Sequence, residues 1–197
     1  MKQVLGTTLA SLFVLTVAAC NVIPEPEQVR VYPLSVGPVT SATQTFNGII
    51  RVNEPSALSA LDTPRLAVYQ DDGRQAYWQG VRLQDRVPLV VQDNLIRALQ
   101  ESGVAQHVVT DNSGSAYQME LQTHIEAFGV QAEQPRIATV VLRAQLRNAS
   151  DRQVIATRRF SAQHEVRNQQ ATGQLAALSR SLQEVQQEMI LWLEQHL

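Results

Sequence analysis

Two stretches in the second half of the chain alternate apolar and polar residues and are followed by a third stretch that is predicted to be a long strand, and this pattern constrains the fold more than any other feature of the sequence. They run from Tyr117 to Phe128, from Ala138 to Arg147 and from Gln153 to Val166. A period of two residues is typical of strands with one buried face. Turn-forming residues at Asn148–Asp151 join the second stretch to the third, so the sequence predicts adjacent strands that share a covered side.

The apolar members of these stretches define the expected buried face. In the first stretch they are Met119, Leu121, Thr123, Ile125 and Ala127, opposite the polar set Gln118, Glu120, Gln122, His124 and Glu126. In the second stretch they are Val140, Leu142, Ala144 and Leu146.

Two segments have helical spacing instead. Asp85 is a candidate cap and Pro88 suits a first turn, after which apolar residues recur at helical spacing until Gly103. Near the end of the chain, a seam is formed by Leu175, Leu178, Leu182, Val185, Met189 and Trp192. Such a seam serves a coiled coil or a helix laid on a sheet, and its short length favours the sheet. We therefore expect an α+β fold, a mostly antiparallel mixed sheet with two main helices packed on it.

Shorter strands are expected before Tyr117, at 28–34, 46–52, 65–70, 75–78 and 104–109. Asp71–Arg74 has the composition of a hairpin turn, since Asp and Gly tolerate positive φ. Residues 54–61, with Pro55 near the start, are expected to form one or two helical turns.

The first residues are typical of an export signal. Lys2 precedes an uncharged run from Val4 to Ala19, which is shorter than the ~20 apolar residues of a spanning helix and ends in small residues. We predict a signal peptide at 1–19, an extended Pro-containing tether at 20–27 and one domain at 28–197.

Within that signal, the sequence Val17-Ala18-Ala19-Cys20 resembles the lipobox of bacterial lipoproteins. The resemblance implies that Cys20 carries a covalent diacylglycerol and an N-acyl lipid, and that Asn21 directs export to the outer membrane. Cys20 is the single cysteine, so the chain has no internal disulfide. The alternative is that Cys20 is a small apolar residue at the end of a membrane anchor.

Several function classes are disfavoured. The formal net charge is −2 and the only adjacent arginines are Arg158 and Arg159, so no nucleic-acid partner is expected. The histidines, His107, His124, His164 and His196, lie too far apart in sequence for a metal signature. No catalytic motif is present, so we expect a protein that is not an enzyme, with no catalytic residue, no metal and no cofactor beyond the lipid on Cys20.

Three aromatic residues near the hairpin are candidates for binding a protein partner: Tyr69, Tyr77 and Trp78. Tyr77 and Trp78 are adjacent in an expected strand, so their side chains point to opposite faces. We expect Trp78 to pack in the interior. The sequence does not assign Tyr77 to either the core or a partner-binding role.

Five segments in order resemble the ABC-type transport auxiliary lipoproteins, the PqiC-like family. They are the lipobox, Val31–Leu34, Pro64–Tyr69, Tyr77-Trp78 ahead of Val87-Pro88-Leu89, and the closing helix from Leu175 to Leu197. The resemblance implies a periplasmic α+β domain anchored at the outer membrane. It also implies a non-catalytic role beside an inner-membrane ABC transporter and an MCE-domain protein that moves lipids between membranes. A homo-oligomer would suit a tubular partner.

Two alternatives stay open. One is an envelope-assembly lipoprotein that binds protein partners without handling lipid. The other is a lipoprotein hydrolase whose histidine, carboxylate and nucleophilic hydroxyl come together only in the folded chain.

Overall fold

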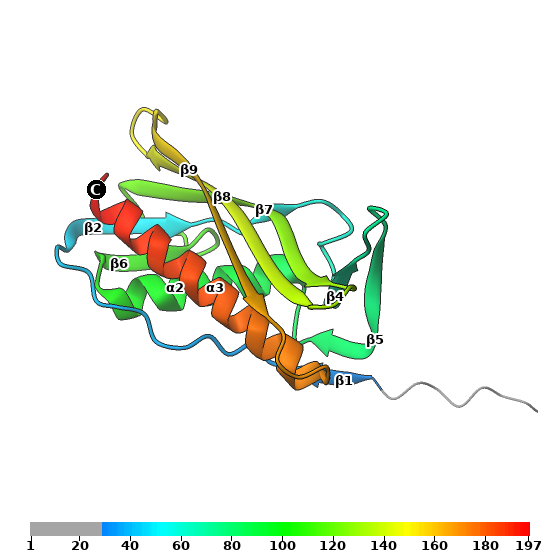
Figure 1. Cartoon of the computed structure of the whole chain (residues 1–197). Coiled ribbons are helices and arrows are strands. Elements are labelled where there is room, and N and C mark those ends of the chain that lie inside the picture. Colours follow the sequence, from blue (N-terminus) through cyan, green and yellow to red (C-terminus); the bar gives the residue numbers. More distant parts are fainter. Residues whose placement is uncertain (1–28) are drawn as a thin grey trace, which may run out of the picture.

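The computed structural model describes residues 29–197, which form a nine-stranded sheet and two helices (Figure 1). The strands are β1 (Arg30–Tyr32), β2 (Phe46–Val52), β3 (Ser56–Ala57), β4 (Arg65–Tyr69), β5 (Gln75–Leu83), β6 (Ala105–Thr110), β7 (Met119–Gln131), β8 (Ile137–Asn148) and β9 (Val154–Glu165). The helices are α2 (Val87–Ser102) and α3 (Ala171–Glu194). The predicted signal, tether, lipobox and Cys20 lie outside the described residues, as does Gln28 at the start of the predicted domain.

Strand β7 is the centre of the sheet. Along one edge it pairs antiparallel with β8, which in turn pairs antiparallel with β9. Along its other edge it pairs in succession with β2, β3 and β4, all parallel. Beyond these, β6 lies parallel to β2, β5 antiparallel to β4, and β1 parallel to β5. The predicted α+β fold with a mixed, largely antiparallel sheet is therefore confirmed.

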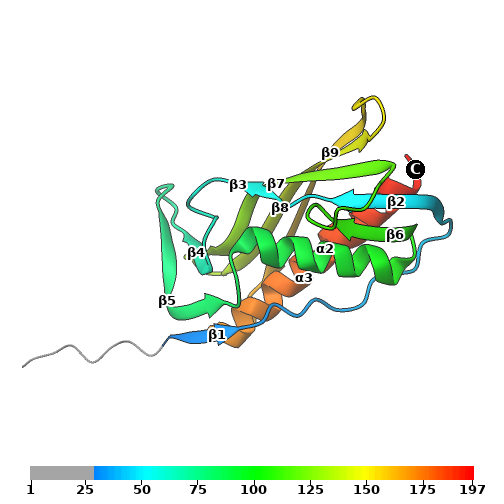
Figure 2. The same ribbon diagram turned by 180° about the vertical axis from the view of Figure 1, so that it is seen from behind.

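Both helices bury one side against this sheet. All six residues of the predicted C-terminal seam are buried on α3, which packs on β8 and β9 (Figure 1). Helix α2 lies beside β2 and β6 and also contacts α3, as the reverse view shows (Figure 2). The interpretation of the seam as a helix laid on a sheet is confirmed, because the residues that would form a coiled coil face β8 and β9.

The ends of α2 follow the predicted signals only in part. Pro88 occupies the first turn, and Gly103 ends the helix with a positive φ of 69°. Asp85 does not cap it; the N-terminal cap is Arg86, without a side-chain cap, and the Asp85 carboxylate accepts the Arg86 backbone N–H at 2.7 Å. Fixed φ at Pro88 is sufficient to start the helix without a capping side chain.

The helical turns expected at 54–61 are wrong. Ser56 and Ala57 form β3, which pairs with His124 and Ile125 of β7. A single turn follows, in which the Leu58 carbonyl accepts the N–H of Leu61 at 2.8 Å and the N–H of Asp62 at 3.1 Å. The open edge of β7 offers backbone partners that a short, isolated helical segment lacks, and tertiary pairing therefore overrides local propensity.

The regular alternation expected along β7 is broken once. The pairing with β8 shifts register between Ile125 and Ala127, so one residue bulges. Beyond the bulge, Phe128 and Val130 are buried, whereas Ala127 is only half-buried. The prediction that Ala127 shares the buried face was wrong because a bulge exchanges the two faces of the strand.

Glycine is required where β4 approaches β7. Gly129 pairs with Ala67, and a Cβ atom at Gly129 would lie 2.5 Å from the Ala67 carbonyl oxygen. That separation is too short for real atoms, so only the absence of a side chain lets the β4–β5 hairpin join the sheet here.

Glu120 on β7 is a buried acidic residue that belongs to a cluster of polar side chains from β2, β7 and β8. Its carboxylate accepts hydrogen bonds from Arg51 and from Asn53 Nδ2 at 2.8 Å, and Arg147 Nη1 lies 3.7 Å away. Burial favours the neutral acid, but the hydrogen bonds from Arg51 and Asn53 outweigh it, so the pKa of Glu120 is lowered from its ordinary value of 4.5. The charged form thus stabilises the fold.

Replacing Glu120 with glutamine is expected to lower the free energy of unfolding at pH 7 by ~1.5–3 kcal/mol, because the arginines lose a charged acceptor. A group whose folded pKa is lowered stabilises the fold above its unfolded pKa, and that contribution disappears as pH falls through the folded value. The difference in the free energy of unfolding between wild type and Glu120→Gln should therefore become smaller below about pH 5. Urea unfolding at several pH values measures it; a gap that widens in acid would contradict the assignment.

Candidate interaction surface on the β4–β5 hairpin

The hairpin that carries the predicted aromatic residues forms as expected. Gln70 N–H donates to the Arg74 carbonyl at 2.9 Å, and Gly73 adopts a φ of 81°. The Asp72 carboxylate accepts the Arg74 backbone N–H at 3.0 Å. These contacts close the turn, and Tyr69 is placed opposite Gln75 as the first pair of the hairpin.

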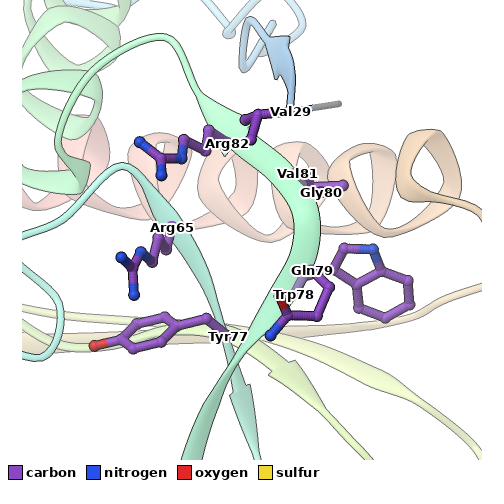
Figure 3. Close-up of a pocket in the computed structure, with 8 residues that line it drawn as sticks. All are labelled: Val29, Arg65, Tyr77, Trp78, Gln79, Gly80, Val81 and Arg82. Carbon is purple, nitrogen blue, oxygen red and sulfur yellow. The ribbon is translucent and has the colours of Figure 1, made fainter. Parts of the chain in front are cut away.

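Further from the turn, the register of the hairpin shifts. Ala67 lies opposite Tyr77, but the next pair is Arg65 with Arg82, so β5 has three extra residues over this interval. Gly80, within that interval, has a φ of 67° that L side chains rarely adopt. Figure 3 shows the result: Arg65, Arg82 and Tyr77 point to the same side of the two strands, and Trp78 points to the other.

A cavity of about 240 Å³ lies at this bulge. It is lined by Val29, Arg65, Tyr77, Trp78, Gln79, Gly80, Val81 and Arg82 (Figure 3). The Tyr77 hydroxyl donates to the Ala60 carbonyl at 3.0 Å, and the Arg65 guanidinium lies 5.4 Å from the centre of the Tyr77 ring. Tyr77 is therefore held in place as one wall, with a cation over its face.

Trp78 occupies the opposite side of β5. It is half-buried and packs against the edge of the core, and the Arg136 guanidinium lies 5.3 Å from its ring centre. The expected opposite orientation of Tyr77 and Trp78 is thus observed. Trp78 is only partly interior, so its indole retains an exposed portion.

Tyr69 lies apart from this cavity. Its hydroxyl accepts the backbone N–H of Phe128 at 3.0 Å, and burial raises the pKa of the Tyr69 phenol even though that hydrogen bond lowers it. The side chain fastens β4 to β7 from within. Of the three aromatic residues proposed from sequence, Tyr77 and Trp78 both line the cavity. Tyr69 does not line it and instead joins β4 to β7.

The fold also brings together one histidine, one hydroxyl and one carboxylate. His164 Nδ1 lies 3.2 Å from Ser181 Oγ, and His164 Nε2 lies 3.5 Å from a Glu184 oxygen. Ser181, however, is fully buried, and its hydroxyl lies 3.1 Å from the Ala138 carbonyl and 3.2 Å from the Ala177 carbonyl. A substrate carbonyl has no access to this oxygen, so the arrangement ties α3 to β8 and does not favour the hydrolase alternative.

Within 29–197, no three histidine, cysteine or acidic side chains gather closely enough to hold a metal ion. Neither α2 nor α3 is both long and apolar enough to cross a bilayer.

Comparison with known families supplies the deciding observation. The model of the family described as ABC-type transport auxiliary lipoprotein component matches residues 32–190, which extend from the end of β1 into α3. The chain belongs to this family. The resemblance seen in the sequence is confirmed, and the match places the chain among auxiliary lipoproteins of ABC-type transport.

Solved structures share the fold of this auxiliary lipoprotein. A DUF330 protein from Xanthomonas campestris superposes with a TM-score of 0.77 at 22% identity, covering 83% of this chain and 94% of its own. A second crystal structure, of an uncharacterized protein, gives a TM-score of 0.67 at 10% identity and covers 84% of this chain and 99% of its own. No match was found among curated protein sequences.

Sequence reasoning missed the two arginines of this surface in the auxiliary lipoprotein. Counting outward from the turn places Gln79 opposite Arg65, and only the register shift brings Arg82 there instead. An isolated glycine inside a strand is a signal of a bulge, and Gly80 was that signal. It could have indicated the irregularity, but not its size.

Proposed function

We propose that this auxiliary lipoprotein is a non-catalytic subunit of a lipid transport system and is anchored to the periplasmic face of the outer membrane through acylated Cys20. The main support is the family match over residues 32–190, which includes almost every element of the domain. The domain itself offers a surface for contact, and the hydroxyl of Ser181 beside His164 and Glu184 is buried.

The anchor follows from the lipobox. A diacylglycerol and an additional acyl chain on Cys20 exceed the two lipid signals that stable attachment requires, whereas one chain binds only marginally. Asn21, in place of an aspartate, supports export to the outer membrane. The anchor would leave the domain to act by contact in the periplasm.

The partners proposed are an MCE-domain protein and its inner-membrane ABC transporter. Tyr77 and Trp78 are both partly exposed and lie on opposite sides of one strand. Aromatic residues of this kind often provide much of the energy of an interface. We therefore assign partner contact to the exposed parts of Tyr77 and Trp78 along β5, with Tyr69 holding β4 against β7, and propose a homo-oligomer as the form that meets a tubular partner.

Affinity purification of the acylated full chain from membranes, followed by mass spectrometry of its partners, tests this function. We expect an MCE-domain protein and ABC transporter subunits to be recovered. Trp78→Ala should reduce their recovery, whereas Leu191→Ala, which removes an exposed apolar side chain from α3, should not. Recovery of pilus or secretion components alone would overturn the transport role in favour of the envelope-assembly alternative.

A further inference from the structure

The sheet contains two places where arginines lie directly opposite each other on neighbouring antiparallel strands. One is Arg143 with Arg159, on β8 and β9. There, Glu126 on β7 accepts a hydrogen bond from Arg143 Nε at 2.9 Å and another from Arg159 Nε at 2.7 Å. Hydrogen bonds from Arg159 and Arg143 lower the pKa of Glu126 and so favour its charged form. This pair of cations has a built-in counter-ion.

The other pair, Arg65 with Arg82 on β4 and β5, has no such counter-ion in the part of the chain that the structure describes. Within residues 29–197, no carboxylate oxygen lies within 4.0 Å of either guanidinium. Opposite residues on antiparallel strands have Cβ atoms only ~4.5–5.5 Å apart, and like charges at that spacing are destabilising. Both side chains are exposed and line the cavity with Tyr77 (Figure 3). The fold thus holds two cations beside an open cavity.

We propose that Arg65 and Arg82 bind the phosphate of a phospholipid headgroup. Guanidinium groups match the oxygens of a phosphate in a planar, two-pronged geometry, and such charge-assisted hydrogen bonds are among the strongest in proteins. The phosphate would take the place that Glu126 holds between the other pair. A cavity of about 240 Å³ is smaller than the ~300–1,000 Å³ of typical ligand pockets. It therefore suits a headgroup and excludes the acyl chains.

The surroundings of the pair indicate a lipid source for that phosphate. Val31 of β1 lies opposite Arg82, and Val29 lines the cavity. These two apolar side chains are 62% and 44% exposed, so apolar and cationic groups share one surface. That combination matches the boundary between headgroups and acyl chains.

Chain length places the same surface near a bilayer. Val29 follows Cys20 by nine positions in the chain, a distance of at most ~32 Å for a fully extended chain. This step rests on the proposed acylation of Cys20. The charge pair and its cavity stand on the geometry of residues 29–197 alone.

The test uses the full acylated chain in dodecyl maltoside, a detergent without phosphate, with arginine Nε–H signals followed by NMR. Phosphatidylglycerol, diacylglycerol and inorganic phosphate are titrated separately. We expect phosphatidylglycerol to shift the Arg65 and Arg82 signals but not that of Arg97, which pairs with Asp93 on α2. Diacylglycerol should produce no such shift. Inorganic phosphate should produce it only at a concentration at least about tenfold higher than phosphatidylglycerol, because it lacks the apolar contacts with Val29 and Val31.

Arg65→Gln/Arg82→Gln should weaken phosphatidylglycerol binding by about tenfold or more, which is the loss expected from removing charged hydrogen bonds. The control Arg97→Gln/Arg158→Gln removes the same charge from exposed ion pairs elsewhere and should bind as the wild type does. The first variant should also unfold at an equal or higher temperature than wild type without lipid, because it removes a like-charge pair.

Equal affinity for inorganic phosphate and phosphatidylglycerol would overturn the headgroup assignment in favour of a free-anion site. No shift with either would overturn the anion site itself, and shifts that require a partner protein would assign the pair to a protein interface instead. An unacylated Cys20, seen by mass spectrometry, or failure to recover the transporter would contradict the proposed function. Neither result changes the binding measured at Arg65 and Arg82, so the two failures are distinguishable.

Discussion

Truncation of Phe160 to alanine is expected to lower the free energy of unfolding by ~3–5 kcal/mol. Phe160 on β9 is fully buried, and its ring meets Trp192 of α3 edge-on, with the ring centres 5.6 Å apart. Removing it leaves a cavity between the sheet and the helix and eliminates a favourable aromatic pair. Urea denaturation followed by circular dichroism measures the loss.

Val154→Ala provides a control on the same strand. Val154 is 50% exposed, and its truncation should change stability by no more than about 0.5 kcal/mol. If Phe160→Ala were as mild as Val154→Ala, the contact between α3 and β9 would not be the main attachment of the helix to the sheet.

Replacement of Cys20 with serine should abolish stable lipid attachment completely. The hydroxyl does not replace the thiol in the acylation reaction implied by the lipobox, and each methylene lost from the membrane removes ~0.8 kcal/mol of affinity. Intact mass spectrometry should show wild-type protein that begins at Cys20 with acyl chains. The variant should show neither the added lipid nor that new N-terminus.

Ser11→Ala is the matched control, since it alters the same predicted signal but leaves Val17-Ala18-Ala19-Cys20 intact. It should give the same lipidated mass as the wild type. Cys20→Ser protein that still carried the lipid, or wild-type protein with an unmodified sulfur, would contradict the anchor.

Much of the architecture could be predicted because its signals are periodic. Strands β7 and β8 and helix α3 each have an apolar pattern long enough to specify the element and most of its buried face, apart from the part of β7 beyond its bulge. Strand β9 was predictable as the strand that returns after the turn at Asn148–Asp151. The hairpin turn at Asp71–Arg74 and the helix end at Gly103 were predictable from backbone preferences. Local chemistry was sufficient at these positions.

Apart from the cap wrongly assigned to Asp85, the failures share one cause, which is that strand register depends on distant partners. The bulge beside Ala127 and the helical turns wrongly expected at 54–61 both reflect pairing with strands far away in sequence. The candidate site was predictable only in its aromatic members, Tyr77 and Trp78. The pairing of Arg65 with Arg82 depends on a three-residue shift that no spacing in the sequence reveals.

The position of β7 has a consequence for how the protein is made. Strands β2, β3 and β4 each use β7 as a partner, but β7 follows them by dozens of residues in the chain. During synthesis, the backbone hydrogen-bonding groups along the edges of these early strands have no β7 partner until β7 has also been made. Folding is therefore expected to be slow and cooperative, as in other proteins rich in distant contacts. A partly synthesised chain that ends before β7 is therefore expected to be the form most susceptible to proteolysis and aggregation.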